Sequence, residues 1–381
     1  MNLKQNLNVK RGEVLGLDIG SCSVKIIALS KDDAGYKVSA AGITQIRDPG
    51  AATRDSHFES AGGADSRTRA TAVAIRECLA QAKLRAKVKL RTNFAVCSVS
   101  GSEVAVRDFA FPPLAPEDVD GAVSLEAAQV CPFNADQAAV DYQLITDGTD
   151  KTTGILVAAT NILVTNKIEL AKKAGLKCVL MDIDGLALLN CFYGLGSNAD
   201  KNEAAILNVG ASYTTLAVMN TDGWPFIRET AYAGDNILDR ISAANDISVE
   251  DLKSILFDEC KDSESKNDSS QLAEQNSHPD AGELMVSLEK ASEELVTGVS
   301  ETLRFYAAQE KSVPIRKIYL CGGFARAEGF AELLNRKLGA EVILWNPFDD
   351  VRCEASQGCM DILKTDGHSL AVAAGLAMRS I

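Results

Sequence analysis

Hydrophobic and polar positions alternate with a period of two in two separate parts of the chain, and a small turn interrupts each alternation. In residues 15–30, LGLDIGSCSVKIIALS, the pattern predicts a strand, a tight turn and a second strand. Residues 204–220, AAILNVGASYTTLAVMN, repeat the same design. One such unit near the start of each half of the chain indicates a duplicated architecture.

Strand and helix patterns follow each other between these two units. Residues 71–90 have the periodicity of a helix, and residues 93–100 are typical of a buried strand. The segment from Phe111 to Gly175 predicts an inserted module, with a proline-rich entry, a helix from about Pro116, two strands and a closing helix. This order of elements favours an α/β fold.

The second half contains one low-complexity stretch and one further glycine turn. Residues 258–283 are polar and charged with almost no apolar anchor, so we expect a mobile surface loop there. A long amphipathic helix is predicted over residues 284–309. It leads into residues 317–339, which predict a strand, a glycine turn and a helix.

Composition places the chain among ordinary soluble globular proteins, since 46% of its 381 residues are hydrophobic and 24% are charged. That length predicts two or three domains. The formal net charge of -13 argues against general nucleic-acid binding and against adhesion to anionic lipid, because both favour a basic surface. No signal peptide and no membrane-spanning run is evident in the sequence, so we expect a cytosolic protein.

The cysteines and histidines give no sign of a metal or catalytic centre. Ten cysteines are scattered through mostly apolar segments without a CxxC pair, which is typical of buried free thiols in a reducing compartment. The three histidines have no candidate ligand nearby in sequence, which argues against a zinc site or a histidine-based triad. The absence of any Gly-Lys dipeptide excludes the P-loop class, and no complete GxGxxG follows a strand.

The turn Gly20-Ser21-Cys22-Ser23 admits two interpretations. It is either a solvent-facing hairpin or a phosphate loop, in which small residues let backbone N–H groups close on an anion while Asp18 holds a metal through water. The matching turn Gly210-Ala211-Ser212 favours the phosphate loop. A third turn, Cys321-Gly322-Gly323, either needs only a positive φ angle or lets the backbone pass flat against a base. Together the three turns predict a nucleotide held between the two halves.

Five segments carry a resemblance to a known superfamily. They resemble, in order and spacing, the phosphate 1, connect 1, phosphate 2, adenosine and connect 2 segments of the actin-like ATPases: DIGSCSVKI (18–26), MDIDGLALLN (181–190), LNVGASYTTL (207–216), YLCGGFARAEGF (319–330) and HSLAVAAGLAM (368–378). Within this superfamily the chain is most similar to the PilM family of type IV pilus assembly, on the evidence of EAAQVCPFNADQAAVDYQLI in the inserted module. The cell-division protein FtsA is a more distant relative.

This resemblance implies an actin-like, ribonuclease H-like duplicated fold with two lobes, a nucleotide cleft and an inserted small α+β subdomain. The first lobe would comprise residues 12–200 and 368–381, with the insert at about 110–176. The second lobe would comprise residues 202–367.

The resemblance also implies ATP and magnesium as ligands and assigns roles to the three turns. Asp18 would hold magnesium through water, and Lys25 would either neutralise phosphate charge or point to solvent. The phosphates would be held by Gly20, Ser21, Cys22, Ser23, Gly210, Ala211 and Ser212. The adenosine would be flanked by Gly322, Gly323 and Phe324, with Gly234, Asp235 and Asn236 approaching the ribose and base from the other side.

Two residues depart from the superfamily pattern and bear on hydrolysis. Asn208 stands where an aspartate is usual, which removes one negative charge from the magnesium site. Asp184-Gly185 replaces the usual Glu-Pro pair, and the aspartate is one methylene too short for the usual water-positioning geometry. We therefore expect a protein that binds ATP and is at most a slow ATPase.

The resemblance implies a cytosolic scaffold of type IV pilus assembly, or of a related secretion system. It would dock the short cytosolic N-terminal peptide of a PilN-like inner-membrane protein, near the inserted module. Such a protein would be peripheral to the inner membrane through its partner, with no direct membrane insertion, and self-association stays open. Two alternatives are an FtsA-like filament protein and a small-molecule kinase of the same fold. The first needs an amphipathic helix after the connect 2 segment, and the second needs a catalytic base that the sequence does not reveal.

Overall fold

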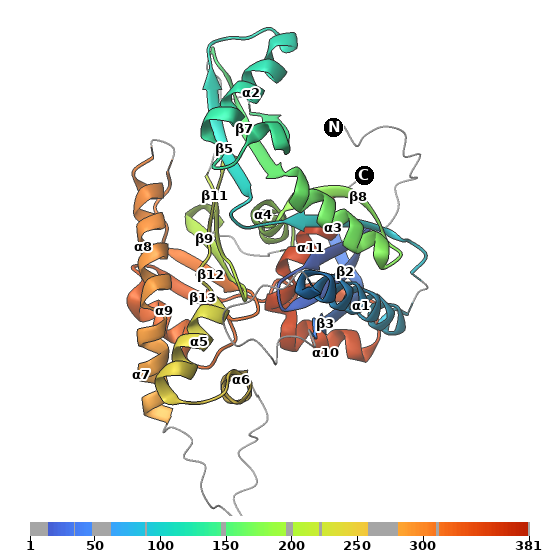
Figure 1. Cartoon of the computed structure of the whole chain (residues 1–381), viewed down its shortest axis with the longest axis vertical. Coiled ribbons are helices and arrows are strands. Elements are labelled where there is room, and N and C mark those ends of the chain that lie inside the picture. Colours follow the sequence, from blue (N-terminus) through green and yellow to red (C-terminus); the bar gives the residue numbers. More distant parts are fainter. Residues whose placement is uncertain are drawn as a thin grey trace, which may run out of the picture.

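Two α/β lobes lie side by side, and a smaller insert projects beyond them (Figure 1). The computed structural model describes residues 14–33, 35–47, 62–87, 90–145, 150–195, 201–220, 223–257, 281–309 and 312–379. The expected surface loop, residues 258–283, lies outside these ranges as far as residue 280. Within the ranges no helix is long and apolar enough to cross a bilayer.

The first lobe is built on a mixed six-stranded sheet whose central strands form the first predicted hairpin. β1 pairs antiparallel with β2 on one side and parallel with β4 on the other. The short strand β14 pairs with β3, so the chain has returned to this lobe before the expected boundary at residue 368. The strand order is β14 (Arg352–Cys353), β3 (Gly35–Gln45), β2 (Ser23–Asp32), β1 (Leu15–Ile19), β4 (Phe94–Val99) and β8 (Lys177–Ile183).

Helices cover both faces of this sheet. Leu15, Leu17 and Ile19 of β1 share a buried cluster with α1 (Gly62–Arg85) and α3 (Asn161–Lys173), which form the outer layer. Residues on the other face of the sheet pack against α4 (Asp184–Leu195) and α11 (Ala371–Ala377). At the rim, α10 (Gln357–Asp366) packs on α1 and β3.

The second lobe repeats this plan with a five-stranded sheet. Its order is β11 (Pro225–Thr230), β10 (Thr214–Met219), β9 (Ala204–Val209), β12 (Lys317–Cys321) and β13 (Glu341–Leu344). One face is buried under α5 (Gly234–Asn245), α6 (Val249–Phe257), α7 (Ala281–Ala291), α8 (Glu293–Ala307) and α9 (Phe330–Lys337). The single amphipathic helix expected over residues 284–309 is thus the consecutive pair α7 and α8, which run on along one side of the lobe in Figure 1.

The two lobes share one hydrophobic layer. Ile206, Ala217 and Ile227 of the second sheet belong to the same buried cluster as α4 and α11. Helix α4 therefore packs on strands of both sheets. A Cβ added to Gly185 at its start would lie 2.4 Å from the Ile227 side chain, so the lobes are in close contact there.

The register of the two hairpins confirms the predicted duplication. In the first, Asp18 lies opposite Lys25, and in the second Asn208 lies opposite Thr215. Each hairpin is followed by a third antiparallel strand and is joined by a parallel strand on its other side, β4 in the first lobe and β12 in the second.

The insert is a small α+β unit with its own core. Its antiparallel sheet has the order β5 (Val104–Phe111), β7 (Thr152–Thr160) and β6 (Ala138–Leu144), and α2 (Pro116–Val130) starts where the sequence predicts. Phe109, Val123 and Leu156 pack between sheet and helix. The sheet begins before the expected boundary at residue 110, and α3 packs against lobe 1 directly after β7.

Glycine sets the distance between the two central helices. A Cβ built on Gly375 of α11 would lie 1.8 Å from the carbonyl oxygen of Ala187 in α4. We predict that Gly375→Ala lowers the free energy of unfolding by about 3 kcal/mol, because the helices must separate to admit the methyl group. Urea unfolding measures this.

The matched control is Gly121→Ala in the middle of α2, where no atom lies within 4 Å of the added Cβ. This variant should be as stable as the wild type or more stable by about 0.5 to 1 kcal/mol, through helix propensity alone. Equal effects of the two substitutions would contradict the packing argument.

Candidate nucleotide-binding site

The two hairpin turns have the same backbone geometry. Gly20 N–H donates to the Ser23 carbonyl at 3.0 Å, and Gly210 N–H donates to the Tyr213 carbonyl at 3.0 Å. A Cβ on Gly20 would lie 3.1 Å from the Ser23 oxygen, and one on Gly210 would lie 2.9 Å from the Tyr213 oxygen. Both turns therefore favour the smallest residue at their first position.

The turns of the two lobes meet at Asp235, in the first turn of α5. Ser212 Oγ donates to Asp235 Oδ2 at 3.2 Å, and Cys22 Sγ donates to Asp235 Oδ1 at 3.8 Å. Burial raises the pKa of the Cys22 thiol, which keeps the proton that this contact uses. The structure thus brings together the predicted residues 20–23, 210–212 and 234–236 from both halves of the chain.

The start of α5 is fixed to the second turn through its backbone. Gly234 N–H donates to the Gly210 carbonyl at 3.1 Å, and Asp235 N–H donates to the Ala211 carbonyl at 2.8 Å. Asn236 caps the helix, since its side-chain oxygen accepts the Ala233 N–H at 3.0 Å. Asn236 is therefore engaged in the helix cap, while Asp235 remains at the meeting point of the lobes.

Lys25 does not point to solvent. Its Nζ lies 3.0 Å from Asp18 Oδ2, and the two side chains are only 13% and 10% exposed. The ammonium group lies within the first turn, 3.5 Å from a Cβ built on Gly20. Of the two alternatives for Lys25, the structure supports the one in which its charge faces the turn.

The third glycine turn packs on the end of the second hairpin's first strand. Gly322 has a φ angle of 100°, and a Cβ there would lie 2.3 Å from the Val209 carbonyl oxygen and 2.6 Å from Asn208 Oδ1. Asn208 Oδ1 also accepts the Cys321 thiol at 3.9 Å, so this oxygen faces the third turn. A residue other than glycine at 322 would strain the backbone and collide with this strand.

Gly323 and Phe324 lie in contrasting surroundings. Gly323 is exposed, and no atom lies within 4 Å of a Cβ built on it. Phe324 is buried in the core of the second lobe, with its ring edge-on to Phe257 and Phe330. The open surface at this turn is therefore provided by Gly323. Phe324 packs into the core beneath the turn and is not exposed to a ligand.

Asp184 lies at the N-terminus of α4, close to Asp18. Removal from water and the nearby charge of Asp18 raise the pKa of Asp184 to about 6. Hydrogen bonds to Ser98 and Ser100 and the charge of Lys167 act in the opposite direction. The carboxyl group is therefore ionised above about pH 6 and beside a second acid, as a water-orienting group would be.

Charged residues from distant segments, among them Lys167 and Glu229, escaped the sequence analysis. Lys167 of α3 reaches the first turn, where its Nζ donates to the Ile19 carbonyl at 2.5 Å. Glu229 of β11 reaches across from the second lobe, where its Oε2 accepts the Gly101 N–H at 2.5 Å. Lys167 lies in an ordinary amphipathic helix and Glu229 in an alternating strand, so neither has a local signal in the sequence.

A cavity of about 260 Å³ opens beside Glu229, between the base of the insert and β11. Tyr213 lines it, and the Tyr213 ring lies against Gly101, whose φ angle is 103°. Ile183, directly before Asp184, also belongs to its wall. The cavity therefore lies between the insert and the part of the site that contains Asp184 and Glu229.

The arrangement of the described residues suits a nucleotide better than a metal ion bound on its own. Among them, no group of three or more His, Cys, Asp or Glu residues could hold a metal. Asp18 has its charge paired with Lys25. The three glycine turns, in contrast, leave backbone close to the surface, which suits a phosphate and a planar base. A magnesium ion would therefore depend on phosphate oxygens and water for most of its ligands.

The fold and these turns define the class of the protein. Solved structures with the same fold include a PilM-PilN type IV pilus biogenesis complex (TM-score 0.74, 22% identity, 97% of this chain and 99% of that one). They also include the ethanolamine utilization protein EutJ from Carboxydothermus hydrogenoformans (TM-score 0.53, 15% identity, 98% and 91%). A third is a nucleotide-free diol dehydratase-reactivating factor (TM-score 0.52, 11% identity, 95% and 98%). The chain therefore has the actin-like two-lobed fold that the sequence predicts.

The family follows from the sequence itself. The family model described as "Type IV pilus assembly protein PilM" matches residues 16–381, nearly the whole chain. The chain belongs to this family, which confirms the resemblance.

The contact of Glu229 with the other lobe predicts a pH effect on the nucleotide-free protein. Burial and the charge of Asp184 raise the pKa of Glu229 from 4.5 to about 8. The folded chain then keeps a proton that the unfolded chain has lost, so stability falls as the pH rises from about 4.5 to about 8. We predict that Glu229→Gln abolishes roughly 2 to 4 kcal/mol of this fall. Urea unfolding at a series of pH values measures it.

Glu301→Gln serves as the control, because Glu301 is an exposed residue of the outer helix α8. Its stability should follow the wild-type pH profile. A Glu229→Gln profile that also follows the wild type would show that this carboxyl group is ionised throughout the range.

Proposed function

We propose that this chain is an ATP-binding, actin-like cytosolic scaffold of type IV pilus assembly, peripheral to the inner membrane through a partner. The observation that supports nucleotide binding is that three glycine turns and Asp235, from both lobes, lie close together. ATP bound there would contact both halves, so its presence would set the angle between them. That angle would in turn position the insert.

Each charged residue of the site has a distinct part in this proposal. Lys25 and Lys167 place positive charge at the first turn and would offset the charge of the phosphates. Asp18 would contact a hydrated magnesium ion, which supplies the remaining positive charge. The Gly20 and Gly210 N–H groups are used within the turns, so backbone N–H groups of residues 21–23 and 211–212 would bind the phosphate oxygens. Gly323 would leave room for the base.

Two residues of the site, Asp184 and Asn208, are the reason that we expect slow hydrolysis. Asp184 is the carboxyl group available to orient an attacking water, and its short side chain starts from the buried end of α4. Asn208 brings no negative charge, and its oxygen faces Gly322. Without an acid at position 208 to help hold the metal ion in place, we expect ATP to stay bound and to be hydrolysed slowly.

Titration of the nucleotide-free protein with ATP and magnesium, followed by phosphate release over hours, tests this proposal. We expect binding with negligible release in the wild type. Gly323→Val should lose at least about tenfold in affinity, because its side chain enters the open space proposed for the base. Rapid release would overturn the slow-ATPase proposal, and absence of binding would overturn the nucleotide itself.

The control for this variant is Gly339→Val. Gly339 also has no atom within 4 Å of an added Cβ and lies outside the three turns. Both variants should unfold at the same urea concentration as the wild type, so that a loss of affinity in Gly323→Val alone reports on the site.

For the partner we propose the cytosolic N-terminal peptide of a PilN-like inner-membrane protein, docking at the insert. One of the solved structures with the same fold is a complex of PilM with PilN. Three large hydrophobic side chains stay exposed on the insert and the first turn of α3: Leu125 at 68%, Leu144 at 45% and Ile162 at 69%. They would give an extended peptide an apolar surface beside the open edge strand β6.

Ile162→Asp should weaken binding of this peptide about tenfold or more in a calorimetric titration, because it places a charge where an apolar contact is proposed. Val286→Asp on α7 is the matched control, since Val286 is also 69% exposed but lies on the second lobe. Equal affinity of the two variants would place the peptide away from the insert.

A further inference from the structure

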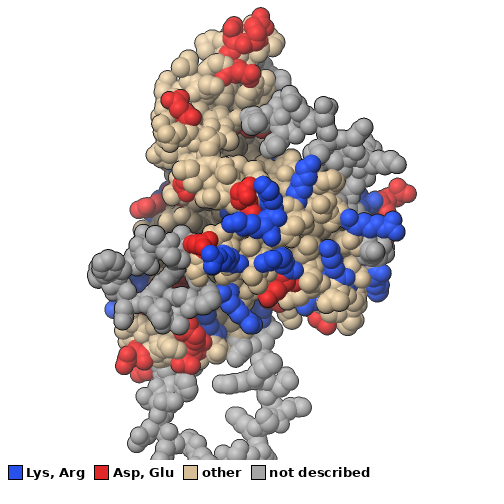
Figure 2. Space-filling model, turned by 45° about the vertical axis from the view of Figure 1, so that its right-hand side comes forward, with Lys and Arg blue, Asp and Glu red and all other residues tan. Residues whose placement is uncertain are grey.

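Lys and Arg side chains gather on one face of the molecule. In Figure 2 they spread over the lobe that α1 and α3 cover, whereas acidic side chains gather at the tip of the insert. These two helices pack side by side on the outer face of the first sheet. We call the exposed surface of α1 and α3, with the segment that follows α1, the basic face.

Its charge is opposite to that of the whole chain. Residues 65–91 contain eight Lys and Arg and two acids, and residues 161–177 contain four Lys and one acid. The two segments therefore carry a net charge of +9 in a chain whose net charge is -13. At physiological ionic strength charges are screened over about 8 Å, so a surface in contact with this face responds to the local charge.

Five exposed bases of these segments are available to a partner. Arg69 pairs with Asp65, and Lys172 with Glu169, each within its own helix. Other exposed bases form no ion pair with any carboxylate in the described ranges: Arg76, Lys83, Lys87, Arg91 and Lys173. The bases are spread along two helices and are not focused on a single point, which suits an extended anionic surface.

An apolar side chain lies among these bases. Leu84 is 84% exposed, more than any other large hydrophobic side chain of the described residues. Lys83 and Arg85 flank it in sequence, and Lys87 follows. An exposed leucine close to lysine and arginine lets a surface contact the headgroups through its bases and the outer acyl region through its apolar side chain.

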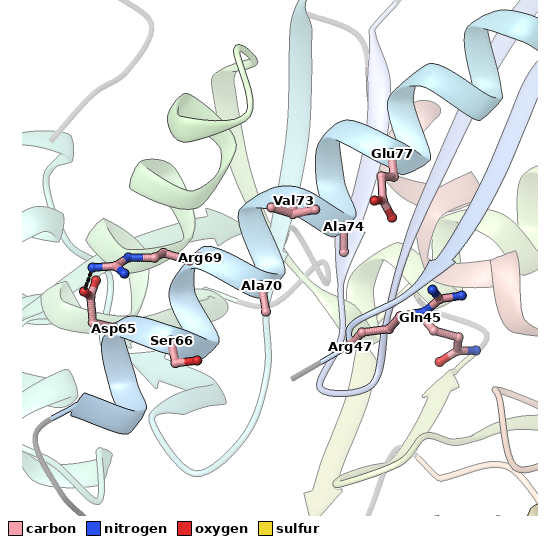
Figure 3. A pocket seen from close by; sticks show the side chains of 9 residues that line it. All are labelled: Gln45, Arg47, Asp65, Ser66, Arg69, Ala70, Val73, Ala74 and Glu77. Atoms are coloured by element: carbon pink, nitrogen blue, oxygen red, sulfur yellow. Dashed lines mark hydrogen bonds and ion pairs between the residues drawn. The ribbon is translucent and has the colours of Figure 1, made fainter. Parts of the chain in front are cut away.

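The neighbouring cavity does not account for the charge. About 480 Å³ of space lies between α1 and the end of β3, and Figure 3 shows the side chains around it. Its two arginines, Arg47 and Arg69, are balanced by Asp65 and Glu77. The cavity therefore has no excess charge for an anionic ligand, and the excess belongs to the open surface of the helices.

Nucleic acid fits this face less well than lipid does. Neither α1 nor α3 contains a Phe, Tyr or Trp on which bases could stack. The rest of the molecule is acidic, and α2 at the far end of the insert has four acids and no base. In Figure 2 the acidic side chains of the insert lie at its tip, apart from most of the basic side chains.

We propose that the basic face binds directly to an anionic lipid bilayer through phospholipid headgroups, with Leu84 entering the interface. This goes beyond the proposed function, in which only a partner protein connects the chain to the membrane. It requires neither ATP nor the partner peptide, so it can fail while the proposed function holds.

Flotation of the full chain with vesicles tests the proposal in the absence of nucleotide and partner. We expect binding to vesicles that contain phosphatidylglycerol, weakening as salt is added, and no binding to phosphatidylcholine alone. A double variant with Lys83→Glu and Lys87→Glu should bind at least about 25-fold more weakly, since each base near the surface contributes roughly fivefold. Leu84→Ser should weaken binding to vesicles and leave binding to heparin unchanged.

The control carries Lys151→Glu and Arg304→Glu, two exposed bases outside the basic face. It makes the same change in net charge and should bind vesicles as the wild type does. Equal loss in both double variants, equal binding to neutral vesicles, or binding to duplex DNA without binding to vesicles would each overturn the proposal.

Discussion

The close packing of α11 against β1 and α4 is the constraint on which the rest of the molecule depends. A Cβ on Gly16 of β1 would lie 1.9 Å from the Ala373 carbonyl oxygen, and Gly375 meets Ala187 as closely on the other side. Both sheets rest on this layer through one continuous hydrophobic cluster. Glycine therefore sets how closely α11 approaches β1 and α4, on which both sheets pack.

Local patterns predicted the repeated hairpins, and they did so because alternation and small turns are properties of short segments. The same analysis left Lys25 undecided, since only the pairing of β1 with β2 places it opposite Asp18. Lys167 and Glu229 were missed because each reaches the site from a distant segment. The basic face was hidden for a different reason: net charge averages over the whole chain, whereas a surface depends on where the charges lie.

Acidic groups dominate the proposed nucleotide site. Asp18, Asp184 and Glu229 lie close enough for Asp18 to raise the pKa of Asp184 and for Asp184 to raise that of Glu229. A triphosphate would add further negative charge, so its binding would rely on Lys25, Lys167 and the cation that accompanies the nucleotide. A protonated Glu229 lessens this repulsion and keeps its contact with Gly101 at neutral pH.

Helix α3 joins two parts of the molecule that otherwise lie apart. It begins at Asn161, directly after strand β7 of the insert, and its Lys167 contacts the Ile19 carbonyl at the first turn. The six residues between these points span about 9 Å of rigid helix. Helix α3 therefore forms a short rigid connection between the first turn and the insert, and it is held by its packing on the first sheet. A displacement of the turn that moved Lys167 would therefore reach the insert through this one helix.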